Sequence, residues 1–61
     1  MIGKNIKQFR ESLGMTQKEL AKKVKMKQPH ISKIEGGHVP SVQTLQKICK
    51  ALGVSICDVL T

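Results

Sequence analysis

The sequence has few of the residues on which catalytic, secreted and membrane proteins most depend. Among 61 residues there is one aromatic side chain, Phe9, with no tryptophan or tyrosine and only two cysteines. No apolar run approaches the ~20 residues that a bilayer-spanning helix needs. The start of the chain also lacks the charged segment and apolar core of a signal peptide. We therefore expect a cytoplasmic protein that has reduced cysteines and no membrane partner.

The length predicts one domain, residues 1–61. A domain of this size buries only roughly 60% of the surface that the unfolded chain exposes. Such a small core leaves no room for an enclosed substrate cleft. A nucleophilic enzyme would also need a base and an oxyanion site, and no such grouping is visible in the sequence. We expect neither an enzyme nor a small-molecule cofactor.

A zinc site is conceivable only by counting His30, His38, Cys49 and Cys57. The chain has no Cys-x-x-Cys or His-x3-His spacing, which is typical of zinc ligands. Cys49 falls on the apolar stripe of an expected helix. We therefore expect no metal.

Acidic residues are scarce, at four against eleven basic ones, which gives a formal charge of +7. Nine of the basic residues lie between Lys4 and Lys33, where Glu11 and Glu19 are the only acidic residues. The whole excess of positive charge is therefore in the first half of the chain. Ordinary solubility explains part of such a surface. Its concentration in one half favours a polyanionic partner.

Apolar residues recur at helical spacing in five segments, and no stretch alternates as a half-buried strand would. A first helix from Ile2 is ended by Gly14, a second begins after Thr16, and a third runs from Lys27 or Gln28 to Gly36. A fourth lies between Ser41 and Gly53, and a short fifth follows a Ser55–Asp58 capping-box pattern. We predict an all-α, compact five-helix fold. Its expected core is Ile6, Phe9, Leu13, Leu20, Ala21, Val24, Ile31, Ile34, Leu45, Ile48, Cys49, Leu52 and Val59.

The segment 16–36 is predicted to form two short helices that face each other across a tight turn. Thr16 and Glu19 make a capping box that marks the start of the first, and Met15 can pack onto Leu20. Ile31 and Ile34 form the only apolar stripe of the second helix, so its outward face is polar. This pairing is typical of a unit that reads DNA.

On the polar face, Pro29, Ser32 and Lys33 point away from the buried stripe. Gln28 and His30 lie on the flanks. A helix fits the major groove, where glutamine pairs with adenine, lysine donates to guanine and serine does either. Proline offers ring carbons to a thymine methyl group. The alternative is that these side chains are ordinary solvent-facing residues.

Backbone contacts are expected around the starts of the two helices. Pro29 suits the first turn of a helix, and neither Lys27 nor Gln28 is a favoured cap, so the exposed amides there are available to water or a phosphate. Gln17 is placed to put its N–H on a phosphate and to brace Gln28, unless it is a helix-start residue without a partner. Lys18 and Lys27 would add attraction that is independent of base sequence.

Four short motifs, spread over nearly the whole chain, can be compared with those of known families. They are Leu13–Gln17 (LGMTQ), Glu19–Ala21 (ELA), Ile31–Glu35 (ISKIE) and Ala51–Val54 (ALGV). In this order and spacing they resemble the phage Cro/CI-type (XRE) helix-turn-helix family. The resemblance implies a five-helix domain that binds double-stranded operator DNA, usually as a symmetric dimer, with the third helix in the major groove.

Position by position, the resemblance places base contacts on Gln28, Pro29, Ser32 and Lys33 and a phosphate contact on Gln17. It also matches Arg10 and Glu35 to a buried ion pair that joins the first and third helices in family members. By itself, Arg10 would be interpreted as surface charge. Such a pair fixes orientation more than it adds stability, because desolvation offsets much of the attraction.

The chain departs from the family pattern in two places. Lys25 occupies a turn position that is commonly glycine, and a side chain at positive φ costs about 1 kcal/mol. Between Gly37 and Thr44, where several relatives carry basic residues, this chain has His38, Ser41 and Gln43. We expect His38 and Ser41 to make weaker, more neutral backbone contacts.

These observations together predict a transcriptional regulator, specifically a repressor, since occupancy of an operator needs no further domain. The alternative from another class is a protein-interaction module, such as an antitoxin or a polymerase-contacting protein, that uses the same basic helices. If the chain forms a homodimer, Ile56 and Leu60 near the C-terminal end are the expected contact. The alternative for these two residues is that they complete the core.

Overall fold

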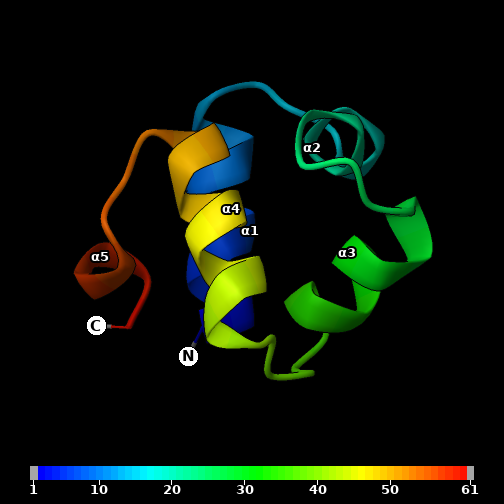
Figure 1. Cartoon of the computed structure of the whole chain (residues 1–61). Coiled ribbons are helices and arrows are strands. Elements are labelled where there is room, and N and C mark those ends of the chain that lie inside the picture. Colours follow the sequence, from blue (N-terminus) through cyan, green and yellow to red (C-terminus); the bar gives the residue numbers. More distant parts are fainter. Residues whose placement is uncertain (1, 61) are drawn as a thin grey trace.

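The computed structural model describes residues 2–60, and within that range it contains five helices and no strand. The helices are α1 (Ile2–Ser12), α2 (Gln17–Lys23), α3 (Gln28–Glu35), α4 (Val42–Leu52) and α5 (Ile56–Leu60). The chain passes through them in this order (Figure 1). The all-α, five-helix prediction is confirmed.

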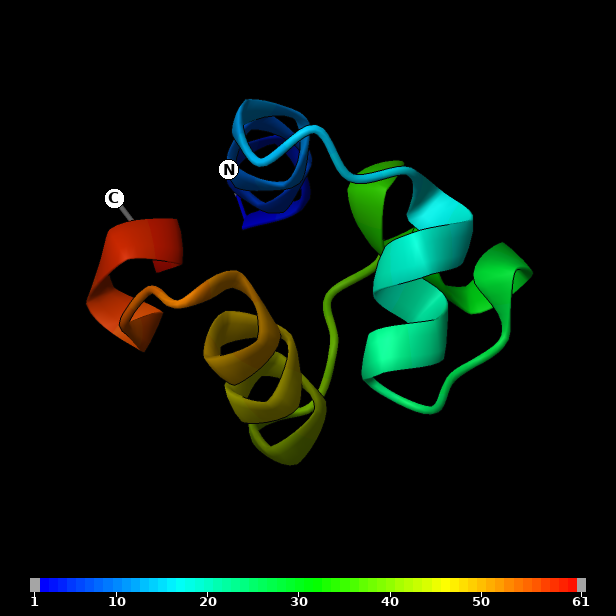
Figure 2. The ribbon, with the colours of Figure 1, turned by 90° about the horizontal axis from the view of Figure 1, so that it is seen from above.

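Helices α1 and α4 form the middle of the molecule, with α2 and α3 on one side of them and α5 on the other (Figure 2). Helix α1 packs against α3, α4 and α5, whereas α2 packs mainly against α3. Asn5 of α1 adds a polar link, because its side-chain amide donates to the Val59 carbonyl at 2.7 Å. The α2–α3 pair is therefore carried on a scaffold made by the other three helices.

The core is the meeting point of the apolar stripes of all five helices. Its buried members are Ile6, Leu20, Ala21, Val24, Ile31, Ile34, Leu45, Ile48, Cys49, Leu52 and Val59. Each of these was predicted from the sequence. Phe9, which was also predicted, is only half-buried and packs against the edge of this cluster.

Leu13 was predicted to be in the core, and this prediction is wrong, since 56% of the residue is exposed. Helix α1 ends at Ser12, and the Leu13 N–H donates at 3.2 Å to both the Phe9 and the Arg10 carbonyls in the closing turn. Gly14 then takes a φ of 68° and reverses the chain. Leu13 thus lies beyond the last regular turn, where helical spacing no longer predicts the buried side.

The predicted caps are present. The Thr16 hydroxyl accepts from the Glu19 N–H at 3.1 Å, and the Glu19 carboxylate accepts from the Thr16 N–H at 2.9 Å. Ser55 and Asp58 make the same reciprocal pair at the start of α5. The Asp58 N–H donates to the Ser55 hydroxyl at 3.3 Å, and the Ser55 N–H donates to the Asp58 carboxylate at 2.9 Å. These bonds satisfy N–H groups that a helix start leaves without partners, and so they fix where α2 and α5 begin.

The turn between α2 and α3 is closed by a hydrogen bond from the Met26 N–H to the Ala21 carbonyl, at 2.8 Å. Lys25 sits in this turn with a φ of 57°, and it is the only non-glycine residue with positive φ in the described range 2–60. The predicted left-handed conformation at Lys25 is confirmed. None of the helices in that range is long and apolar enough to cross a membrane.

Candidate nucleic-acid interface

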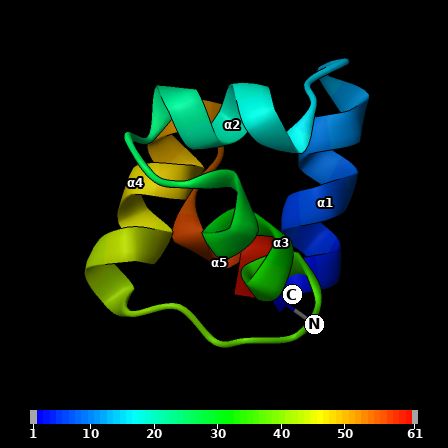
Figure 3. The ribbon, with the colours of Figure 1, turned by 90° about the vertical axis from the view of Figure 1, so that its right-hand side faces the viewer.

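The outward face of α3 is polar and open to solvent. Ile31 and Ile34 are completely buried, whereas residues 28–30, 32 and 33 of the same helix are exposed. The exposed set includes all four predicted base-reading residues, Gln28, Pro29, Ser32 and Lys33. Figure 3 shows α3 at the surface of the molecule with α2 crossing above it. No other described element covers this face of α3, so it is free to meet a partner.

The start of α3 has no side-chain cap. Lys27 occupies the N-cap position with extended backbone angles and makes no capping hydrogen bond, and Pro29 lies in the first turn. Proline has no N–H there to satisfy. The uncapped start that was predicted from the sequence is confirmed, and it leaves the positive end of the helix dipole at the surface.

A buried ion pair joins the end of α3 to α1. Arg10 donates through Nε and Nη2 to the two carboxylate oxygens of Glu35, at 2.7 and 3.1 Å, and through Nη1 to the Met15 carbonyl at 2.6 Å. The two side chains are only 9% and 4% exposed. The hydrogen bond to Glu35 raises the pKa of Arg10 above its ordinary value, against the opposing effect of burial. The ion pair that the family resemblance implied is confirmed.

Gln17 connects this ion pair to the outward face of α3. Its Nε2 donates to Glu35 Oε1 at 3.0 Å, and its Oε1 accepts from Gln28 Nε2 at 3.2 Å. The predicted brace between Gln17 and Gln28 is therefore present. The hydrogen bond from Gln17 to Glu35 was not predicted, because sequence spacing gives no sign that side chains 18 positions apart meet.

Two shallow depressions gather most of the predicted contact residues. Gln17, Lys18 and Gln28 line one of them together with Arg10 and the turn before α2. The other lies beside α3, and its lining includes Lys27, Pro29, Lys33 and His38. Together the two depressions bring cationic and amide side chains to the α3 face.

Ser41 stands apart from both depressions. Its hydroxyl accepts from the Thr44 N–H at 3.2 Å and donates to Thr44 Oγ1 at 3.0 Å, so it is used as the N-cap of α4. His38 lies in the loop after α3, and its N–H donates to the Lys33 carbonyl at 2.9 Å. Of the two predicted loop contacts, only His38 is tied to the α3 face.

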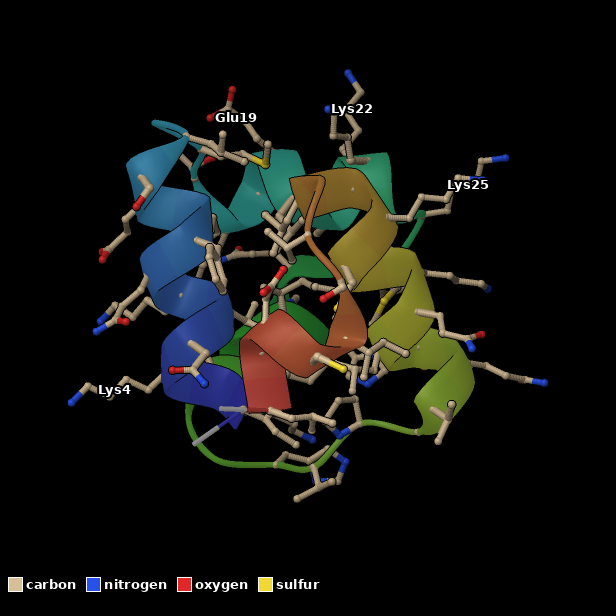
Figure 4. The ribbon with its side chains drawn as sticks, turned by 90° about the vertical axis from the view of Figure 1, so that its left-hand side faces the viewer. Lys4, Glu19, Lys22 and Lys25 are labelled. Carbon is tan, nitrogen blue, oxygen red and sulfur yellow. The ribbon has the colours of Figure 1, made fainter. Side chains whose placement is uncertain are left out.

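Basic charge is not confined to that face. In the view of the opposite side, Lys4, Lys22 and Lys25 extend outward from the rim of the molecule (Figure 4). All three are exposed. Charges placed in this way act over a distance on any polyanion but do not distinguish one base sequence from another.

Within residues 2–60, no three histidine, cysteine or acidic side chains are grouped so as to hold a metal ion. Cys49 is buried in the core, and burial raises the pKa of its thiol. Cys57 is exposed on α5. The two cysteines and the two histidines considered above therefore do not form a common site.

Comparison with known proteins agrees with this geometry. The sequence model of the helix-turn-helix family matches residues 6–59. Multiprotein-bridging factor 1 of Candida albicans is 45% identical over 56 residues, which is 90% of this chain and 37% of that protein. The regulator SinR of Bacillus subtilis is 39% identical over 62 residues, which is 98% of this chain and 56% of SinR. The chain thus spans well under two thirds of the length of these relatives.

Two solved structures have the same fold. SinR in complex with DNA superposes with a TM-score of 0.93 at 38% identity, over all of both chains. The clp gene regulator ClgR from C. glutamicum gives a TM-score of 0.89 at 35% identity, over 97% of this chain and 78% of that one. With its helix order, its buried Arg10–Glu35 pair and these matches, the chain belongs to the Cro/CI-type helix-turn-helix family.

Proposed function

We propose that this chain binds double-stranded DNA in a sequence-specific manner by inserting α3 into the major groove, and that it regulates transcription in this way. The observation that carries the proposal is the exposed polar face of α3, on which Gln28 is held by Gln17. Duplex DNA presents a distinct set of donors and acceptors for each base pair in the major groove. A rigid helix with a polar outward face is suited to read that pattern.

Each side chain of the interface has a proposed role. Gln28, Ser32 and Lys33 would hydrogen-bond to base edges, and Pro29 would contact a thymine methyl group. Gln17, Lys18, Lys27, His38 and Ser41 would meet the phosphate backbone and set the position of α3 along the groove. Since Ser41 already caps α4, its contribution there is the smallest of this set.

The similarity to SinR supports the proposal, because that protein was solved in complex with DNA and aligns over the whole of this chain. Repression is the proposed mode of regulation. A bound domain blocks access to DNA by occupancy alone, without a separate sensing or activating surface. Residues 1–61 are proposed to act as one DNA-binding domain. The proposed location is the cytoplasm, in association with the nucleoid.

A homodimer on a palindromic operator is part of the same proposal. Dimeric helix-turn-helix proteins place their two recognition helices about 34 Å apart, in successive major grooves. Of the two residues proposed as the contact, Ile56 packs against the core and Leu60 is 55% exposed, so Leu60 offers most of the apolar area. Light scattering after size exclusion, with and without operator DNA, tests this. A strictly monomeric species in both conditions contradicts it.

The DNA-binding proposal is tested by selecting bound duplexes from a random pool and then comparing the affinity of the chain for the selected duplex and a scrambled one. We expect a ratio of roughly 10³ or more in favour of the selected duplex. Gln28→Ala should reduce the ratio strongly, whereas Gln46→Ala, an exposed glutamine of α4, should leave it unchanged. Equal affinity of the wild-type chain for both duplexes would rule out sequence-specific binding.

A second candidate is a module that binds an acidic protein through the same basic helices. The similarity to multiprotein-bridging factor 1 favours it. That relative is named for bridging proteins, and it is 45% identical over 90% of this chain. Salt-sensitive binding does not separate the two candidates, because both depend on charge. Discrimination between duplexes does, since a protein-binding module has no reason to prefer one base sequence.

A further inference from the structure

A further cationic surface lies on the side of the molecule, between the end of α2 and helix α4. It is a depression of about 630 Å³, lined by residues of α2, of the turn after α2, of α3 and of α4. Figure 3 shows the end of α2 and this turn on the side of the molecule where α4 lies. We propose that the depression is a docking site for an acidic peptide segment of a partner protein. This docking does not depend on the proposed DNA-binding function.

Positive charge is concentrated around the opening of the depression. Four exposed lysines line it, two from the end of α2 and the turn after it and two from α4. We call this set the lysine rim: Lys23, Lys25, Lys47 and Lys50. Lys47 and Lys50 are three positions apart, so they lie on the same side of α4. Like charges around one opening repel each other, and an anionic partner relieves that repulsion.

The acidic side chains of the chain do not neutralise this rim. None of the four acidic residues lines the depression. Glu19 and Asp58 are held in the capping boxes of α2 and α5, and Glu35 is bound by Arg10. Glu11 lines the depression at the start of α2. The side chains of the chain thus leave the rim for another molecule to neutralise.

Apolar residues also line the depression, and they indicate the class of partner. Val24 is buried, and Met26 and Ala51 are partly buried against the core, so these three form an apolar floor below the exposed rim. A duplex backbone of sugar and phosphate has no large apolar group to place there. Single-stranded nucleic acid stacks on aromatic side chains, and Phe9, the one Phe, Tyr or Trp residue of the chain, lies on α1.

A peptide in which acidic and apolar residues alternate matches both features. Its carboxylates would meet the lysine rim, and its apolar side chains would cover the apolar floor. Lysine suits the edge of such a site, because its apolar stem packs along the surface while its charge stays in water. The match of charge with the rim and of apolar area with the floor therefore favours an acidic peptide over a nucleic acid.

The depression leaves the outward face of α3 free. Helix α3 contributes only His30, which lies on the opposite flank from Gln28 at about 100° per residue. None of the four proposed base-reading residues lines the depression. Lys25, Met26 and His30 also line the depression beside α3, so the two surfaces are neighbours. Unlike the second candidate function, this docking site would not compete with DNA for α3.

The test uses the full chain without DNA and a fluorescein-labelled synthetic peptide in which aspartate and leucine alternate. Fluorescence anisotropy at physiological salt measures the affinity. Lys47→Ala/Lys50→Ala should weaken binding roughly five- to tenfold, because it removes half of the rim. The matched control is Lys4→Ala/Lys7→Ala, which removes two exposed charges from α1 and should change the affinity within about twofold. Equal weakening by both variants would show that net charge alone holds the peptide, and would overturn the docking site.

A second peptide, with serine in place of each leucine, tests the apolar floor. It should bind at least about tenfold more weakly, because it has no apolar area to bury. In an amide chemical-shift titration of the wild-type chain with the aspartate–leucine peptide, the largest changes should fall at residues 23–26 and 44–51. Equal affinity for the two peptides, or changes at residues 28 and 30–33 instead, would overturn the docking site. This titration uses no variant, so it decides the question if a variant does not fold.

Binding to the selected duplex separates this inference from the proposed function. Lys47→Ala/Lys50→Ala should change the affinity for the duplex by less than about threefold, and the peptide should still bind the chain when the duplex saturates it. If the duplex displaces the peptide and the double variant loses as much affinity for DNA as for the peptide, the depression is part of the DNA surface and the docking site is wrong. If the chain distinguishes no duplex but binds the peptide in the depression, the proposed function fails and the docking site stands.

Discussion

Gly3 of α1 lies directly against the carbonyl oxygen of Ile34 in the last turn of α3. A Cβ atom built on Gly3 would clash with that oxygen and would be 3.0 Å from the Glu35 carbonyl oxygen. The two helix backbones therefore approach each other as closely as glycine permits. This contact, together with the Arg10–Glu35 ion pair, fixes the position of α3 against α1.

Gly3→Ala should destabilise the fold by about 2 kcal/mol, since the added methyl group meets backbone atoms that cannot rotate away. Thermal or urea unfolding measures this. Lys4→Ala is the control at the next, exposed position, where the change should stay within about 0.5 kcal/mol. A Gly3→Ala variant as stable as the wild type would show that the two helices separate without cost.

Lys25→Gly should stabilise the fold by about 1 kcal/mol, because glycine adopts the φ of 57° without the clash of a Cβ atom. For a domain of this size that corresponds to a rise in melting temperature of roughly 4–8 °C. Lys25→Ala serves as the control, since it removes the charge and keeps the strain, and should show no such rise. A clear fall for Lys25→Gly would contradict the account of this turn.

The Glu19 cap should make stability depend on acid pH. Hydrogen bonds from the Thr16 backbone and side chain hold the pKa of Glu19 below its ordinary value of 4.5. A carboxyl whose pKa is lowered by folding stabilises the fold fully above its ordinary pKa, and this stabilisation is lost as the pH falls through the lowered value.

Melting temperatures of the wild type and Glu19→Gln, measured from pH 7 to pH 3, test this dependence. The wild type should melt higher at pH 7, and the difference should shrink as the pH falls below about 4.5. Gln8→Ala, an uncharged exposed position, should give a difference that does not change with pH. A constant difference for Glu19→Gln would mean that its charge has no part in the cap.

Lys18→Ala and Lys27→Ala should each reduce the slope of log affinity against log salt concentration by about one, as expected for a lost phosphate contact. Both side chains line the depressions beside Gln28 and Pro29. Lys4→Ala is the control, because Lys4 extends from the rim of the molecule (Figure 4). Equal changes in slope for all three variants would indicate binding without a defined face.

Much of the fold was predictable because its signals are local. Capping boxes, glycine stops and apolar spacing depend on residues within one or two turns, so the five helices and eleven core residues followed from them. Leu13 failed because it lies where the helix ends and spacing no longer applies. Gly3 was missed, because a close contact between residues 31 positions apart leaves no mark on the nearby sequence.

The site was predictable to a similar degree. The exposed face of α3 followed from the position of its two isoleucines, and the Arg10–Glu35 pair followed only from the family resemblance. The bond from Gln17 to Glu35 depends on the angle between α2 and α3, which no local pattern gives. What the sequence missed is therefore the tertiary geometry that holds Gln28 in place.

The most direct test of the account is an amide chemical-shift titration of the chain with its selected duplex. We predict the largest changes at Gln28, at residues 30–33 and at Gln17 and Lys18, with small changes at 47–52 in the second half of α4. That result would place the outward face of α3 on the DNA. Large changes in α4 and α5 with residues 28–33 unmoved would contradict the claim that α3 is the reading helix.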